Sequence, residues 1–167
     1  MHKRAVIPLA YSPYQEPVIV VDADSCPVKQ EIVGTAAAFQ VTVLMVASHD
    51  HRLEKQPGVD IVQVDRSDQS VDLYIVNHIK RGDVVITGDF GLACVAIGKG
   101  AIVLSPRGEQ YTDANIDYLM ERRHESARRR RAGGRTRGPK AMSGEDRAAF
   151  QQKLTKVLSD MQEKDDI

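Results

Sequence analysis

Residues 18–27, VIVVDADSCP, contain the pattern that is most diagnostic of the architecture. Val18–Val21 is an unbroken run of β-branched side chains, which is typical of a strand buried on both faces of a sheet. The polar loop Asp22–Cys26 follows at once. Pro27 then favours the first turn of a helix, where its missing N–H would have no partner. The stretch predicts a buried strand, a polar turn and a helix.

The same alternation repeats along the chain. Further apolar strands are expected at 41–47, 60–65, 83–87 and 101–104, and helices at 28–39, 67–80, 90–99 and 112–131. Strands that alternate with helices in this way favour an α/β fold, with a mainly parallel central sheet of about five strands flanked by helices on both faces.

Composition and pattern divide the chain into four segments. These are an irregular N-terminal extension (1–17), an α/β domain (18–120), a basic helix end with an Arg/Gly loop (121–142), and a C-terminal helix packing on the same domain (143–162). Ser143 and Asp146 resemble a capping box, with Asp in place of the usual Glu, at the start of that last helix.

Composition excludes several classes of protein. The 167 residues include only two cysteines, Cys26 and Cys94, which excludes a disulfide framework and a multi-cysteine zinc site. No apolar run approaches the roughly 20 residues of a membrane span, so no membrane partner is expected. A cytoplasmic location is the simplest expectation. No obligate protein partner is evident.

The net charge of zero hides a strong asymmetry. Residues 121–140 hold eight Arg and one Lys against two Glu, so the other 147 residues carry a surplus of seven negative charges. A basic arm on an acidic body is typical of proteins that bind nucleic acid. A solvated basic helix end, or a lid that pairs with the body's own acids, is the alternative interpretation.

Acidic residues follow the predicted strands at the positions where α/β folds place ligands. Asp22 and Asp24 come directly after the first strand and Asp89 after the fourth, while Asp68 and Asp72 open the helix between. Ligands of open α/β sheets bind beyond the carboxyl ends of the strands, so these carboxylates share one crevice if the first and fourth strands are neighbours. Their mutual repulsion would require shared protons or a cation such as Mg²⁺ or Mn²⁺. Ordinary turn and cap roles are the structural alternative.

Five motifs in order resemble one bacterial family. They are VVDADSCPVK (20–29), VDLYIVNHIKRGDVVITGDFGLA (71–93), LSPRG (104–108), YTDANID (111–117) and RRAGGRTRGPK (130–140). Together they resemble the uncharacterised YaiI/YqxD family, which is similar to the PIN-like nuclease superfamily. That similarity implies a three-layer fold with strand order 3-2-1-4-5, an acidic cluster that binds Mg²⁺ or Mn²⁺, and RNA cleavage.

The resemblance assigns roles to particular residues. It implies that Asp22, Asp72 and Asp89 bind metal, with Asp68 matched less securely, and that Asp24 binds metal or orients water. We predict that RNA is held by Arg107, Arg128, Arg129, Arg130, Arg131, Arg135, Arg137 and Lys140. The leading hypothesis is a divalent-metal-dependent ribonuclease.

Two other functions are considered beside the nuclease. One is an RNA-binding module of the same fold that has no turnover. The other is a phosphatase of the haloacid dehalogenase type, because Val18–Asp24 also reads as four apolar residues followed by D-x-D.

Overall fold

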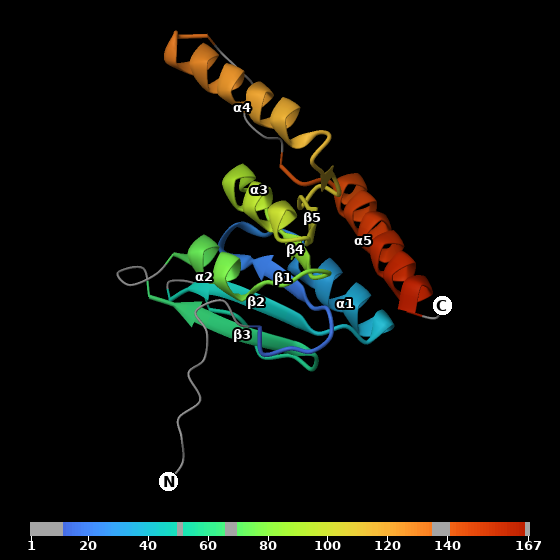
Figure 1. Ribbon diagram of the computed structural model, residues 1–167. Helices are drawn as coiled ribbons and strands as arrows, with labels where there is room; N and C mark the ends of the chain where they lie inside the picture. The colour runs from blue at the N-terminus through green and yellow to red at the C-terminus, as the bar shows by residue number, and fades with distance from the viewer. Residues whose placement is uncertain (1–11, 50–51, 66–69, 135–140, 166–167) are drawn as a thin grey trace.

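The computed structural model describes residues 12–49, 52–65, 70–134 and 141–165 (Figure 1). In chain order the elements are β1 (Ile19–Asp22), the 3-10 turn η1 (Ala23–Ser25), α1 (Lys29–Phe39), β2 (Val43–Ser48), β3 (Val59–Val64), α2 (Val71–His78), β4 (Val84–Ile86), α3 (Phe90–Gly98), β5 (Ile102–Leu104), β6 (Gln110–Tyr111), α4 (Ile116–Arg131) and α5 (Gly144–Asp165).

The strands form one six-stranded sheet in the order β3-β2-β1-β4-β5-β6. All pairs are parallel except β5 with β6, so the predicted mainly parallel sheet and its 3-2-1-4-5 order are confirmed. The sequence analysis did not predict β6, because two residues are too short to show a period. In the register, Asp22 pairs with Val46 of β2, which places Asp22 at the carboxyl edge of the sheet.

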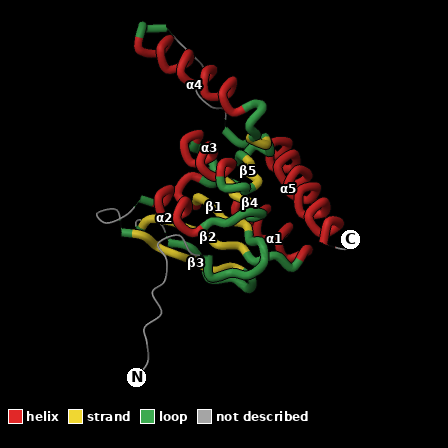
Figure 2. Tube along the Cα trace, viewed as in Figure 1, coloured by secondary structure: helices red, strands yellow, loops and turns green. Residues whose placement is uncertain are grey.

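Helices cover both faces of the sheet and create three layers (Figure 2). Side chains alternate along β1, so Ile19 and Val21 point into one core while Val20 points into the other. The first core is shared with buried residues of α1 and α5, and the second with those of α2, α3 and the start of α4. The central strands β1, β2 and β4 are therefore buried on both faces, whereas the edge strand β3 is only partly buried.

The two C-terminal helices differ in how they meet the body. α5 packs against α1 and buries Phe150 and Leu154 completely. Ser143 and Asp146 make the reciprocal hydrogen bonds of a capping box, at 3.0 and 3.1 Å. α4 instead projects from the layers, and Ile116 is its buried residue (Figure 1).

Three expected boundaries were wrong. The helix expected from Thr112 begins at Ile116, because Thr112 belongs to a turn in which its N–H donates to Asn115 Oδ1 at 2.8 Å. Pro27 precedes its helix instead of lying in the first turn, since α1 begins at Lys29. α2 ends at His78, two residues earlier than expected, and the expected start of that helix at 67 lies outside the described residues. None of the described helices combines the length and hydropathy of a membrane span.

Candidate functional site

A crevice of about 290 Å³ lies at the carboxyl edge of the central strands. Its lining residues are Asp22, Asp24, Ser48, Val64, Ser70, Val71, Asp72 and Asp89. Segments far apart in the sequence thus bring four carboxylates to one place. Asp68, the fifth candidate acid, lies outside the described residues.

Each carboxylate is positioned by a different element. Asp22 ends β1, Asp24 lies in η1, Asp72 is in the first turn of α2, and Asp89 is the N-cap of α3. Parallel strands that start at the same end of the sheet finish at the same edge, so the connections after β1 and β4 meet there.

Thr87 connects two of these acids. Its buried hydroxyl donates to Asp22 Oδ2 at 3.1 Å and accepts from the Asp89 backbone N–H at 3.0 Å. Asp89 Oδ1 in turn accepts from the Leu92 N–H at 2.9 Å, which caps α3. In the sequence, Thr87 stands only within the motif at 71–93 and this role was not predicted, although a threonine two residues before an acid was the available signal.

The other two acids are held differently. Asp24 Oδ1 accepts from the Ser48 N–H at 2.9 Å, which ties η1 to the end of β2. Asp72 is exposed and, within the described part of the chain, makes no hydrogen bond. The start of its helix is capped by Ser70, whose hydroxyl accepts from the Leu73 N–H at 3.4 Å.

The charges of this crevice act on Asp22. Burial raises the pKa of its carboxyl, the hydrogen bond from Thr87 lowers it, and the negative charges of the other three acids raise it again. Asp22 is therefore the acid with the most to gain from a nearby cation.

The donor chemistry of the crevice fits a hard divalent ion. Aspartate oxygens are the ligands that Mg²⁺ and Mn²⁺ prefer. In the described residues, however, no three acidic, histidine or cysteine side chains form a ready-made ligand cluster. Asp22, Asp72 and Asp89 are the crevice residues that could hold such an ion.

The predicted nucleic-acid ligands that the structure describes lie in two places. Arg128–Arg131 form the last turn of α4, where Arg129 pairs with Glu125 at 3.0 Å and Arg128 approaches Glu121 at 4.0 Å. These partners lie on α4 itself, which disfavours the lid interpretation for these two arginines. Arg107 forms a surface ion pair with Asp146 at 2.9 Å. Arg135, Arg137 and Lys140 lie outside the described residues.

A pocket of about 420 Å³ lies between α3 and α4, beside the crevice. Phe90, which follows Asp89, contributes to its wall, and the Arg123 guanidinium stands 5.4 Å from the centre of the Phe90 ring. The sequence analysis named neither residue. The aromatic residue directly after the acid was the available signal, but its approach to α4 depends on the tertiary structure.

Other reactive side chains have structural roles. Burial raises the pKa of the Cys26 thiol, and the neighbouring acids Asp22 and Glu31 raise it further, so a thiolate nucleophile is disfavoured. Glu31 pairs with Arg147 at 3.3 Å and does not line the crevice. A phosphatase of the haloacid dehalogenase type is expected to have a catalytic lysine beside its acids. No lysine is found among the described residues of the crevice lining, which disfavours this alternative.

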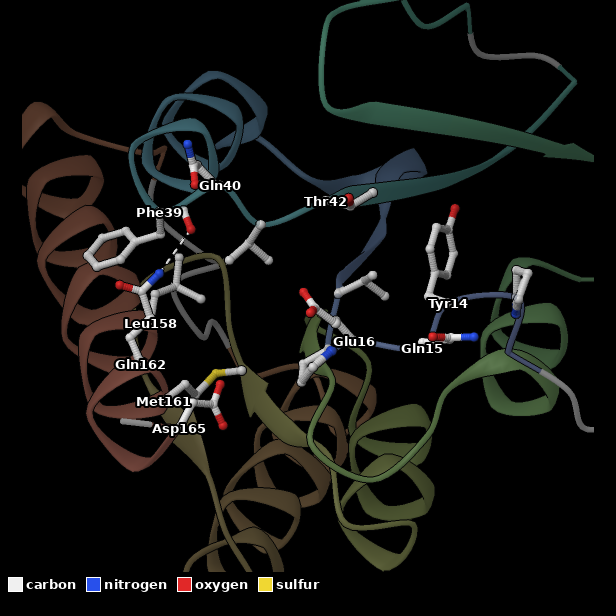
Figure 3. A pocket seen from close by; sticks show the side chains of 14 residues that line it. Tyr14, Gln15, Glu16, Phe39, Gln40, Thr42, Leu158, Met161, Gln162 and Asp165 are labelled. Carbon is white, nitrogen blue, oxygen red and sulfur yellow. Dashed lines mark hydrogen bonds between the residues drawn. The ribbon is translucent and has the colours of Figure 1, made fainter. Parts of the chain in front are cut away.

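A larger cavity, of about 480 Å³, lies at the opposite edge of the sheet, where β1 and β2 begin (Figure 3). Phe39, Leu158 and Met161 give it an apolar side, and Gln162 closes one flank by donating to the Phe39 carbonyl at 3.0 Å. Its acids, Glu16 and Asp165, belong to separate segments. The converging carboxylates make the smaller crevice the better candidate for chemistry.

Comparisons with known proteins agree with the motifs. A UPF0178 protein of Halalkalibacterium halodurans is 47% identical over 141 residues, covering 84% of this chain and 90% of that one. A UPF0178 protein of Bacillus cytotoxicus is 48% identical over 141 residues, covering 84% and 92%. The crystal structure of a mutant of Rae1 (YacP) from Bacillus subtilis matches with a TM-score of 0.37 and 19% identity, over 86% of this chain and 98% of that one. The model of the family described as "Uncharacterized BCR, YaiI/YqxD family" matches residues 20–160, and this chain belongs to that family.

Proposed function

We propose that this protein is a divalent-metal-dependent ribonuclease of the cytoplasm. The observation that carries the proposal is that Asp89 lines the four-carboxylate crevice while the next residue, Phe90, approaches Arg123 of the basic helix α4 at 5.4 Å. An acidic crevice alone would repel a polyanion, and a basic helix alone would hold RNA without reaction. Side by side, the two surfaces supply both binding and chemistry.

Asp22, Asp72 and Asp89 would hold Mg²⁺ or Mn²⁺. When bound, such an ion lowers the pKa of water and stabilises the charge that develops on a phosphodiester. The Thr87 hydroxyl orients the Asp22 carboxylate toward this role, because it fixes one oxygen through a hydrogen bond. Asp24, anchored on the Ser48 N–H, would orient the attacking water.

The arginines of α4 would hold the phosphate backbone. Four consecutive arginines, Arg128–Arg131, form the last turn of α4, and Arg123 stands 5.4 Å from the centre of the ring of Phe90, the residue after Asp89. Their positive charge offsets the repulsion between RNA and the acidic body. The charge asymmetry of the sequence then has a single explanation.

The replacement of Asp89 by Asn tests the proposal. Asn keeps the cap of α3, because its side-chain oxygen can still accept from the Leu92 N–H, but it removes the charge needed to bind metal. We expect Mn²⁺-dependent cleavage of a labelled single-stranded RNA to fall by at least about 100-fold. RNA binding should persist. Asp160→Asn, on the exposed surface of α5, is the matched control and should cleave normally.

Unchanged cleavage by the Asp89→Asn protein would show a contaminating nuclease and reject the proposal. A second function, RNA binding without turnover, is favoured by the absence of a ready-made ligand cluster among the described residues. Calorimetry separates the two. If the wild-type protein takes up no Mn²⁺ and yet binds RNA with a steep salt dependence, the binding function is correct.

A further inference from the structure

The pocket between α3 and α4 has the composition of a nucleotide subsite. It is lined by Phe90, Gly91, Met120, Arg123, His124, Ala127 and Arg130. The aromatic ring, the thioether and the alanine methyl provide an apolar surface, while the two arginines provide positive charge and, together with the histidine, hydrogen-bond donors. Its volume of about 420 Å³ is within the range of small-molecule sites.

The Phe90 ring is held in place from behind. Tyr111, buried in the second core, packs against it with ring centres 5.3 Å apart and planes tilted by 54°. Phe90 itself is only partly buried, so part of its surface faces the pocket. A rigid, supported aromatic surface loses little conformational entropy when it binds a flat ligand.

The pocket adjoins the acidic crevice. Asp89 lines the crevice and Phe90, the next residue, lines the pocket. An RNA strand with one phosphate at the carboxylates would therefore carry an adjacent nucleotide to the pocket.

We propose that this pocket binds one unstacked nucleobase of the RNA strand that enters the crevice. This inference rests on the proposed function and adds a substrate requirement to it. The base contacts Met120 and displaces the Arg123 guanidinium, which stands 5.4 Å from the centre of the Phe90 ring, so that Arg123 and Arg130 each face a flanking phosphate. In a duplex the bases are stacked and paired, so the subsite selects single-stranded RNA.

Abasic scanning tests the subsite. The probe is a fluorescent single-stranded RNA in which one nucleotide at a time lacks its base, which leaves the backbone charge unchanged. Anisotropy in EDTA measures binding without cleavage. For the wild-type protein we expect one position at which the missing base weakens binding roughly 5- to 100-fold, the range for loss of one stacked base.

Two variants locate the effect in this pocket. Ala127 is half-buried on α4 and lines the pocket, so Ala127→Leu places a larger side chain there and keeps a good helix former. This variant should bind intact RNA as weakly as the wild-type protein binds the abasic probe. For this variant, removal of the base at the sensitive position should not weaken RNA binding any further. Phe90→Leu should behave in the same way. Tyr118→Ala removes an exposed aromatic ring from the same helix, outside the pocket lining, and should keep the wild-type position dependence.

The outcomes separate this inference from the proposed function. If the wild-type protein binds RNA but no abasic position matters, or if Ala127→Leu keeps the wild-type position dependence, the subsite is wrong and the ribonuclease proposal stands. If the wild-type protein binds no RNA at low salt, both are rejected.

Discussion

The hydroxyl of Thr87, at the end of β4, donates a hydrogen bond of 3.1 Å to the carboxylate of Asp22, at the end of the neighbouring strand β1. The same hydroxyl accepts from the Asp89 N–H, so one side chain positions two acids of the crevice. The consequences for charge, pH dependence and stability can be measured.

Replacing Thr87 by Val should raise the pKa of the Asp22 carboxyl and so shift the pH dependence of Mn²⁺ binding to higher pH. The hydrogen bond from Thr87 lowers the pKa of Asp22, so without it the Asp22 carboxyl keeps its proton to a higher pH. Because protons and cations compete for this carboxylate, we expect weaker Mn²⁺ binding, most clearly on the acidic side of neutrality. Isothermal titration at several pH values measures the shift.

Stability gives a second readout of the same substitution. Val leaves the Asp89 N–H without its hydroxyl partner, which should cost about 1–3 kcal/mol of unfolding free energy. Thr87→Ser should restore the wild-type pH dependence. Thr155→Val, which removes an exposed hydroxyl on α5, is the control for the loss of a hydroxyl. A Thr87→Val protein with wild-type Mn²⁺ binding at every pH would contradict this prediction.

Asp22→Asn should stabilise the metal-free protein at neutral pH. The pKa of Asp22 is raised on folding above its ordinary value of 3.8, so the folded state holds this proton more tightly than the unfolded state. Stability from Asp22 is therefore present below pH 3.8 and is lost as pH rises through the folded pKa. We expect the variant to melt a few degrees higher at about pH 7 in EDTA, with the difference vanishing near about pH 3.

Two comparisons make this prediction specific. Asp146→Asn should have the opposite sign at neutral pH, because hydrogen bonds from Ser143 lower the pKa of Asp146 in the folded state. Mn²⁺ at about 100 times its dissociation constant should stabilise the wild-type protein by about 2.7 kcal/mol and the Asp22→Asn protein much less. Lower stability of Asp22→Asn than of wild type in EDTA at neutral pH would show that burial and repulsion do not destabilise the Asp22 carboxylate.

Replacing Arg128, Arg129 and Arg131 by Gln should reduce the salt dependence of RNA binding. Each phosphate contact that is lost lowers the slope of log affinity against log salt by about 0.7 for a single strand, so three contacts lower it by about 2. Replacing Lys153, Lys156 and Lys164 of α5 by Gln makes the same change of net charge elsewhere. If the two triple variants have equal slopes, RNA binding depends on the net charge of the protein and not on the arginines of α4.

Gly108→Ala should destabilise the docking of α5. Gly108 has φ of +85°, and a Cβ there would lie 3.0 Å from Phe150 Cα and 3.1 Å from the Ala149 carbonyl oxygen. Backbone strain and overpacking should together cost about 2 kcal/mol or more in urea unfolding. Gly34→Ala, in α1, has open space around its Cβ and should instead stabilise by up to about 1 kcal/mol. If Gly108→Ala leaves the free energy of unfolding unchanged, α5 can move away from residue 108 without a loss of stability.

Several features of the fold could be predicted from local pattern. The run of β-branched residues at Val18–Val21 and the repeated alternation with helical segments predicted the mainly parallel sheet. Ser143 and Asp146 indicated the cap of α5 because both partners lie within one turn. The start of α4 was wrongly predicted at Thr112, because the backbone of Thr112 belongs to a turn that precedes the helix.

The order of residues along the chain predicted that Asp22 and Asp89 follow the first and fourth strands. That these strands are neighbours, so that both acids lie at one edge of the sheet, was implied by the family resemblance and is confirmed by the strand order. The packed molecule was needed to establish which hydroxyl connects them, that α4 projects beside α3, and that Phe90 and Arg123 meet across that gap. Strand ends follow from short-range hydrophobic pattern and the direction of the chain. Contacts between side chains of separate elements depend on how whole helices pack, which no local pattern encodes.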